Sequence, residues 1–253
     1  MSRQPGSPEW FRALRPRPAP RARLFCFPYA GGSDFVFREW PRHLAPDVEI
    51  HAALLPGRAS RISAEPLTSI SAMAERLAEG VRPLLDRPFA FYGHSMGAFI
   101  AFEVARRLRS GAGAGPAHLF VGGCRAPQLP DPDPPIHGLP DEEFVANLRR
   151  LNGTPAEVFE HPELMRLMLP LLRADFEAVE SYVYEPGEPL ACRVSAYGGL
   201  RDTLVAREQL EGWREQAAGD FSLSVFDGDH FFLQQSAPQL LRALDRELAR
   251  LVG

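Results

Sequence analysis

The sequence predicts an α/β fold with a mainly parallel, doubly wound sheet. Short apolar runs alternate with amphipathic segments through residues 23–125 and again through residues 187–253. Such alternation is typical of parallel strands that are joined by helical crossovers. Between the two halves, residues 126–186 break the pattern, because they contain proline-rich and helical stretches without a strand. A chain of 253 residues is long enough for one such domain with an inserted helical segment.

The elements of the first half follow from hydrophobic periodicity. Continuous apolar runs predict strands at 23–32, 48–58, 89–93 and 118–124. Apolar residues at helical spacing predict helices at 70–85 and 96–109, and a Gly/Ala-rich loop follows at 111–115. Residues 1–22 are rich in proline and arginine and are predicted to form an N-terminal arm.

The insertion and the second half are predicted from the same signals. Prolines exclude a helix or a central strand from residues 125–140. Helices are expected at 141–152 and 161–184, and Pro170 is expected to kink or divide the second of them. Alternation then resumes with a strand, a helix, a strand and a helix near 190–199, 205–217, 221–230 and 237–251.

The composition excludes several classes of function. A net charge of −4 implies neither nucleic acid nor an anionic membrane as a partner. Cys26, Cys124 and Cys192 lie in or beside apolar runs without ligand spacing, so they are expected to be buried thiols and no metal site is expected. No signal-peptide core and no membrane-length apolar run occur, so we expect a cytoplasmic protein, with a monomer as the default.

The stretch GHSMG, residues 93–97, lies between a predicted strand and a predicted helix. This is the context of the G-x-S-x-G nucleophile elbow, in which a serine on a strained corner projects its hydroxyl group. Side chains at positions 93 and 97 would collide with the neighbouring strand and helix. A tight turn with a passive serine is the alternative interpretation, but the strand-to-helix context favours Ser95 as a nucleophile.

A nucleophilic serine needs a base, and the base needs an acid that orients it. In this topology the acid precedes the histidine, and both follow the serine. His230 is the candidate base, because it lies late in the chain and just after a predicted strand. Asp202 is favoured as the acid over Asp227 and Asp229, because a carboxylate from a separate loop approaches the imidazole better than one from the histidine's own loop.

An oxyanion hole requires two backbone amides. The N–H of Met96, at the start of the helix after the elbow, is the first candidate. The loop after the first predicted strand, Pro-Tyr-Ala-Gly-Gly, is the usual source of the second. There we expect Ala30 to donate its N–H and Tyr29 to line the substrate pocket, although a simple turn is the alternative.

Further stretches along nearly the whole chain match one known family. They include FCFPYAGG, LPGR, GHSMGA, LRRLNGTP, LMLPLLRADFEAVESYVY, GGLRDTLV and GDHFFL. Together they resemble the type II thioesterases, the stand-alone editing enzymes of polyketide and nonribosomal peptide assembly lines. The resemblance implies an α/β-hydrolase fold with a core at 23–125 and 187–253, and a mobile helical lid at 126–186.

The resemblance also implies an activity and a partner. Acyl groups would be hydrolysed from the phosphopantetheine thiol of an acyl or peptidyl carrier protein, which removes aberrant or stalled units. Because a thiol is a good leaving group, no metal or cofactor is expected. Carrier domains are typically acidic, so Arg58, Arg125 and Arg201, which lie near predicted strand ends, are candidate contacts as well as candidate solvated charges.

Three other functions compete with this interpretation. A carboxyl-ester hydrolase or lipase of the same fold would carry the same triad, and only the whole-chain resemblance favours a thioesterase. An acyltransferase also uses a GHSxG elbow, but the late acid-then-histidine order argues against it. A catalytically silent binding module is disfavoured by the presence of all three triad residues.

Overall fold

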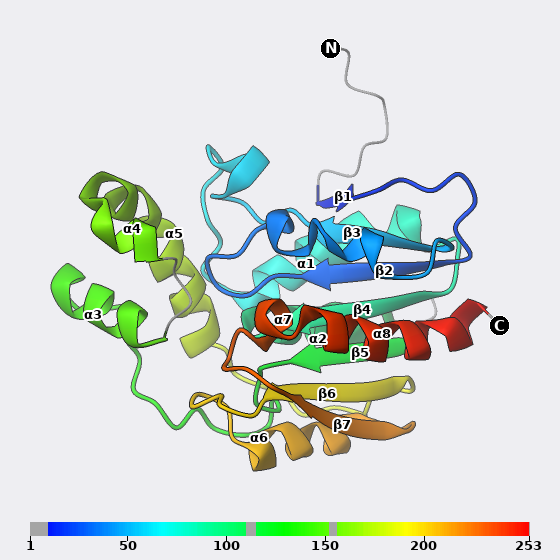
Figure 1. Ribbon diagram of the computed structural model, residues 1–253. Coiled ribbons are helices and arrows are strands. Elements are labelled where there is room, and N and C mark those ends of the chain that lie inside the picture. Colours follow the sequence, from blue (N-terminus) through cyan, green and yellow to red (C-terminus); the bar gives the residue numbers. More distant parts are fainter. Residues whose placement is uncertain (1–9, 110–114, 152–155, 253) are drawn as a thin grey trace.

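The computed structural model describes residues 10–109, 115–151 and 156–252. Its centre is a seven-stranded sheet of order β1-β3-β2-β4-β5-β6-β7 (Figure 1). All neighbouring strands are parallel except β1, which runs antiparallel to β3. The strands are β1 (Phe11–Ala13), β2 (Ala22–Phe27), β3 (Val48–Ala53), β4 (Phe89–His94), β5 (His118–Gly122), β6 (Arg193–Gly199) and β7 (Phe221–Phe226). The predicted mainly parallel α/β sheet is confirmed.

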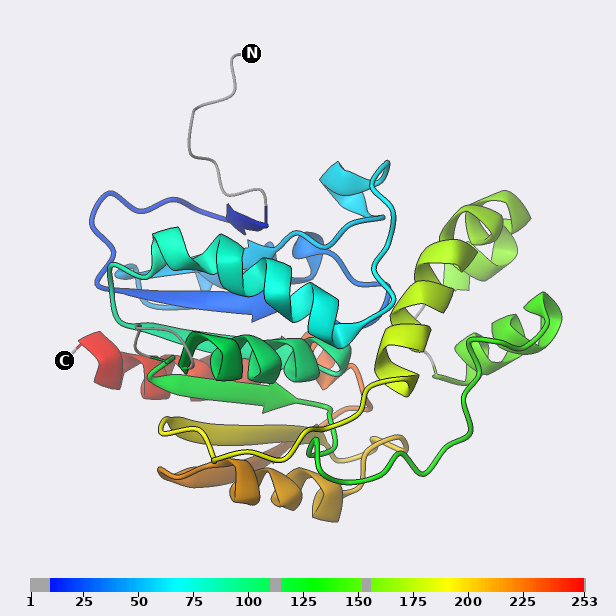
Figure 2. The same ribbon diagram turned by 180° about the vertical axis from the view of Figure 1, so that it is seen from behind.

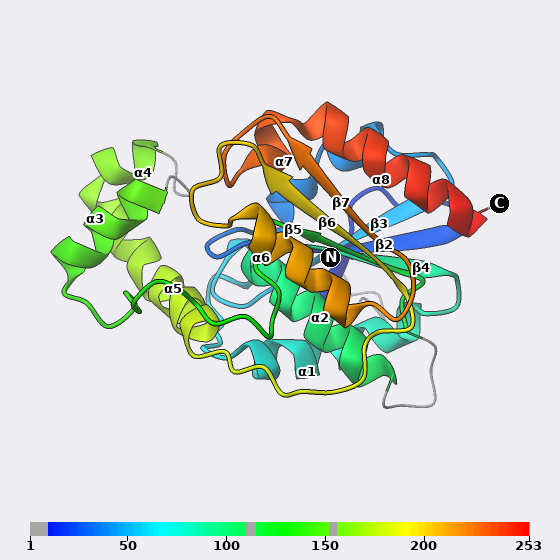
Figure 3. The same ribbon diagram turned by 90° about the horizontal axis from the view of Figure 1, so that it is seen from below.

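Helices cover both faces of the sheet, as the view along its edge shows (Figure 3). One face packs against α1 (Ile70–Val81), α2 (Met96–Arg109) and α6 (Arg207–Glu211), and the other packs against α7 (Phe232–Gln235) and α8 (Ala237–Val252). Because the central strands β2, β4 and β5 are buried on both sides, they are mostly apolar without alternation, whereas the edge strand β7 alternates. None of the described helices is long and apolar enough to cross a membrane.

Between β5 and β6 the chain leaves the sheet and forms three helices beyond the carboxyl ends of the strands (Figures 1 and 2). These helices are α3 (Asp141–Leu151), α4 (Ala156–Glu160) and α5 (Pro162–Glu180). They share a small apolar cluster of their own, which contains Phe144, Leu148 and Leu172. The described parts of residues 126–186 contain no strand, in agreement with the interrupted alternation of the sequence.

Helix α5 is continuous through Pro170. The prediction that Pro170 would kink or divide the helix is therefore wrong as far as a division is concerned. Pro170 is exposed, whereas the next two residues, Leu171 and Leu172, are buried against the core. A proline removes one intrahelical hydrogen bond. At this position the ring displaces no packing, and the burial of the opposite face keeps the helix together.

The N-terminal segment differs from the expected arm over part of its length. Phe11–Ala13 forms the edge strand β1, and the ring of Phe11 is buried in edge contacts with Phe25 and Phe27. A three-residue strand surrounded by proline and arginine has too little periodicity to be recognised from the sequence. Residues 1–9 of the predicted arm and residues 111–114 of the predicted Gly/Ala loop lie outside the described residues.

Candidate active site

Ser95 forms the corner between β4 and α2 with a φ of 52°, a left-handed conformation that is uncommon for residues other than glycine. The glycines beside it are required by close backbone contacts. A Cβ atom on Gly93 would lie 2.1 Å from the carbonyl oxygen of Gly97, and one on Gly97 would lie 2.1 Å from the carbonyl oxygen of Phe27. The corner therefore has the strain and the crowding of a nucleophile elbow.

His230 and Asp202 come from the loops after β7 and β6, and their side chains meet at the carboxyl edge of the sheet. The Nδ1 atom of His230 lies 3.0 Å from Oδ2 of Asp202, whose side chain is only 1% exposed. The other carboxylate oxygen, Oδ1, accepts hydrogen bonds from the backbone N–H groups of Leu204 and Val205. The carboxylate thus contacts the imidazole with one oxygen and binds the backbone of its own loop with the other.

The hydrogen bonds around Asp202 favour its charged form. Burial raises the pKa of this carboxyl, but the hydrogen bond with His230 and the two backbone donors outweigh burial and leave the pKa below its usual value. The rival carboxylates have other partners: Asp227 pairs with Arg201, and Asp229 accepts from the backbone N–H of Phe231. The geometry therefore places Asp202, from a separate loop, at Nδ1 of the imidazole.

His94, inside the elbow, binds the backbone of the loop that carries His230. Its ring is fully buried, and Nε2 lies 2.8 Å from the carbonyl oxygen of His230. Burial lowers the pKa of His94 to about 3, so the ring is neutral at ordinary pH. A carbonyl can only accept, so Nε2 carries the proton and Nδ1 is left to accept from the hydroxyl of Tyr92 at 3.2 Å. Sequence analysis did not assign this role.

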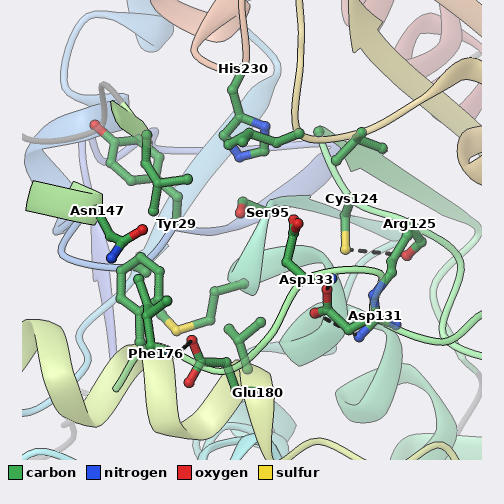
Figure 4. Close-up of a pocket in the computed structure, with 18 of the residues that line it drawn as sticks. Tyr29, Ser95, Cys124, Arg125, Asp131, Asp133, Asn147, Phe176, Glu180 and His230 are labelled. Atoms are coloured by element: carbon green, nitrogen blue, oxygen red, sulfur yellow. Dashed lines mark hydrogen bonds and ion pairs between the residues drawn. The ribbon is translucent and has the colours of Figure 1, made fainter. Parts of the chain in front are cut away.

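All the predicted site residues except Asp202, which is bound behind the imidazole of His230, line one cavity of about 570 Å³ (Figure 4). Ser95, Met96, His230, Ala30 and Tyr29 all contribute to its wall from the core. The opposite wall comes from the insertion, by residues that include Ile136, Asn147, Leu148, Leu172, Phe176 and Glu180. The lining of the cavity combines apolar side chains with many polar and charged ones, and a cavity of this size is typical of a small-molecule site.

The loop Pro28–Gly32 after β2 carries the second candidate amide. It closes as a tight turn, in which the N–H of Gly32 donates to the carbonyl of Tyr29 at 2.8 Å. The ring of Tyr29 packs edge-on against Phe231, and its hydroxyl accepts from the side chain of Gln234. Among the described residues the N–H groups of Ala30 and Met96 have no acceptor, so both donors at the cavity wall are unused by the fold.

Most charged groups that line the cavity are paired. Arg125 donates to Asp131 and to the carbonyl of Leu129, and Glu180 holds His137 and two backbone N–H groups. Within the described parts of the chain, no group of three or more His, Cys, Asp or Glu side chains has the arrangement of a metal site. Cys26, Cys124 and Cys192 are free and buried, as expected.

Arg58 differs from the expectation of a surface contact. It is only 5% exposed, and its guanidinium binds the fully buried carboxylate of Asp175 through two contacts of 2.7 Å. The two residues lie 117 positions apart, so no local pattern indicates that they pair. Arg201, by contrast, is exposed and pairs with Asp227.

This fold, with a serine at a strained elbow and an Asp–His pair at the same edge of the sheet, defines an α/β-hydrolase. The Thioesterase domain model matches residues 22–248. The chain therefore belongs to the thioesterase family.

Known proteins of similar sequence and structure indicate which kind of thioesterase this chain resembles. The gramicidin S biosynthesis protein GrsT of Aneurinibacillus migulanus is 44% identical over 240 residues, which cover 95% of this chain and 94% of the relative. The solved structure of YbtT, a type II thioesterase from the yersiniabactin NRPS/PKS pathway, matches with a TM-score of 0.87 and 35% identity over 96% of this chain and all of that one. The type II thioesterase BorB from the borrelidin cluster matches with a TM-score of 0.84 and 35% identity over 95% and 96% of the two chains. The resemblance to type II thioesterases is confirmed.

Proposed function

We propose that this thioesterase hydrolyses acyl groups from the phosphopantetheine thiol of acyl or peptidyl carrier proteins, and so removes aberrant or stalled units from a nonribosomal peptide or polyketide assembly line. The observation that carries the proposal is the position of Ser95 and His230 on the wall of one cavity, with the buried Asp202 bound to the imidazole of His230. Relatives named for such pathways support the substrate class.

In the proposed reaction Ser95 Oγ attacks the thioester carbonyl while Nε2 of His230 takes the hydroxyl proton. The N–H groups of Ala30 and Met96 stabilise the oxyanion that forms. The C–S bond then breaks, and the imidazolium returns its proton to the departing thiolate. Water, deprotonated by the same imidazole, attacks the acyl-serine and releases a free carboxylic acid and the regenerated hydroxyl group.

The insertion, residues 126–186, is proposed to act as the lid of this site. Its helices supply the wall of the cavity opposite Ser95, and this wall includes apolar side chains such as Leu148 and Phe176. Such a wall suits an acyl chain delivered on a flexible arm, and it keeps bulk water from the reacting carbonyl.

The test is hydrolysis of acetyl-, propionyl- and hexanoyl-loaded carrier protein beside matched p-nitrophenyl esters, for the wild type and Ser95→Ala. We expect the carrier-bound thioester to turn over faster than the free ester, and Ser95→Ala to lower kcat at least about 10³-fold. The alternative function is a general esterase of the same fold. Cleavage of the free ester alone would favour that alternative and overturn the carrier-protein assignment.

A further inference from the structure

One carboxylate of the insertion reaches the loop that carries Ala30. Asp175, on α5, is fully buried, and its Oδ2 atom accepts from the backbone N–H of Gly31 at 2.7 Å. The same oxygen accepts from Arg58 at 2.7 Å, and Oδ1 accepts from the other guanidinium nitrogen at 2.7 Å. Gly31 directly follows Ala30, so this carboxylate is bound to the peptide next to the candidate oxyanion donor.

Arg58 holds the same loop from the other side. Besides Asp175, its guanidinium donates to the carbonyl of Gly32 at 3.1 Å and to that of Pro56 at 3.3 Å. The Arg58–Asp175 pair therefore binds an N–H and a C=O group of two consecutive residues of the loop. These contacts hold Gly31 and Gly32, and the N–H of Gly32 in turn donates to the carbonyl of Tyr29 at 2.8 Å. That carbonyl lies in the same planar peptide as the N–H of Ala30, so its position determines where this N–H points.

Helix α5 also packs directly on the two loops that the pair connects. Gly31 has a φ of 77°, and a Cβ atom there would lie 2.7 Å from a methyl group of Leu172. Gly57, in the loop of Arg58, has a φ of 79°, and a Cβ atom there would lie 3.3 Å from a methyl group of Leu171. Leu172 and Asp175 lie one turn apart on the same helix, so the contact is continuous.

Stability alone does not account for this arrangement. Removing two charges from water costs about as much as their attraction returns, and apolar side chains often replace a buried ion pair without loss of stability. The polar contacts of this pair beyond the two side chains go to the backbone of the loops after β2 and β3. We propose that Arg58 and Asp175 are positioning residues that orient the N–H of Ala30 toward the oxyanion, so that α5 belongs to the catalytic apparatus as well as to the lid. This inference rests on the proposed function.

The experiment compares Asp175→Asn, the double variant Arg58→Met/Asp175→Leu and the wild type on a small N-acetylcysteamine thioester, which needs no carrier docking. Arg173→Met is the matched control, because Arg173 lies on the same helix but pairs with Asp141 inside the insertion. Three quantities are measured: kcat, KM and the inhibition constant of an acyl trifluoromethyl ketone, whose adduct with serine carries an oxyanion. Thermal unfolding reports the fold.

A misplaced oxyanion donor weakens only the transition state, so kcat falls while KM stays. We expect both Asp175→Asn and the double variant to lower kcat about 10- to 100-fold, to change KM less than about threefold and to weaken the inhibitor by a factor similar to that for kcat. The double variant should unfold at the wild-type temperature, and Arg173→Met should keep wild-type kcat. Recovery of wild-type kcat in the double variant would reduce the pair to a structural anchor.

Failure of the proposed function would give a different result from failure of the positioning role. If the wild type and Ser95→Ala hydrolyse the thioester equally slowly, the triad assignment falls whatever the variants of the pair do. If Asp175→Asn does not fold, the double variant decides, because it leaves no unpaired buried charge. If the double variant also unfolds while Arg173→Met is stable, the pair is required for folding and the positioning role is overturned.

Discussion

The two sides of Ser95 are held in place by different parts of the molecule. On the side of His230, each supporting contact comes from the sheet core. The loop of Asp202 is bound to the loop of His230 by a backbone hydrogen bond of 2.8 Å from Arg201 to Gly228, and His94 binds the carbonyl of His230 from β4. The proposed proton-transfer groups are therefore held at the carboxyl ends of β4, β6 and β7.

On the side of Ala30, the core shares the support with the insertion. The loop after β2 is bound by Asp175 and contacted by Leu172, and both residues belong to the insertion between β5 and β6. The comparison indicates that a change in the insertion can alter the rate of the reaction without touching the triad. Changes in the core should alter proton transfer instead.

The largest effect is expected on the core side, from Asp202→Asn. The amide oxygen can still accept from the N–H groups of Leu204 and Val205, so the loop should keep its shape. The amide nitrogen, however, faces Nδ1 of His230 and forces the proton onto Nε2, which then cannot accept from Ser95. We expect kcat to fall about 10³- to 10⁴-fold.

This loss is measured as steady-state kcat on the thioester, beside the unfolding temperature. An unchanged unfolding temperature with the large loss of kcat would locate the defect in the tautomer of the imidazole. Asp227→Asn is the control from the rival position, and it should stay within about twofold of wild type because Asp227 pairs with the exposed Arg201. A similar loss in both variants would contradict the assignment of the acid.

A smaller effect is expected from His94→Leu, which removes the donor to the carbonyl of His230. A buried acceptor left without a partner costs about 1–3 kcal/mol, and part of this cost should appear as displacement of the catalytic loop. We expect kcat to fall about tenfold. His94→Gln retains an N–H donor and should recover most of the rate. Equal activity of His94→Leu and wild type would show that the core loops hold His230 without this bond.

Sequence reasoning could predict those residues of the candidate site that lie in local motifs. Ser95 lies in a five-residue pattern, and Asp202 and His230 each follow a recognisable strand, so periodicity and chain order predicted that they meet. The supports on the side of Ala30 are pairs of distant residues. Arg58 and Asp175 each resemble an ordinary surface charge, and only the packing of α5 on the loop after β2 brings them together. The sequence pattern also missed β1, because three residues are too few to show a period.

The smallest effect on kcat is expected at His118, at the amino end of the sheet. A change there should alter the stability of the fold at low pH and leave catalysis unchanged. His118 begins β5, where Nε2 lies 2.8 Å from the hydroxyl oxygen of Ser195. Burial, helped by the charges of Arg193 and Arg250, lowers the pKa of His118 to about 3. The unfolded chain, with an ordinary pKa near 6.5, therefore binds a proton between these two values while the folded chain does not. The contribution of the neutral, buried His118 to the free energy of unfolding is therefore fully present above about pH 6.5, and it is lost as the pH falls toward 3.

Replacing His118 by Gln removes the titration and keeps a hydrogen-bonding side chain near Ser195. Between pH 7.5 and pH 5.0 the free energy of unfolding of the variant should fall about 2 kcal/mol less than that of the wild type. Urea unfolding at the two pH values measures this difference, and carboxylates that titrate in both proteins cancel. His118 begins β5 and is not among the residues that line the cavity, so kcat should stay within about twofold. A loss of kcat would mean that the amino end of the sheet also influences the site, and the division between a catalytic core side and a catalytic insertion side would be incomplete.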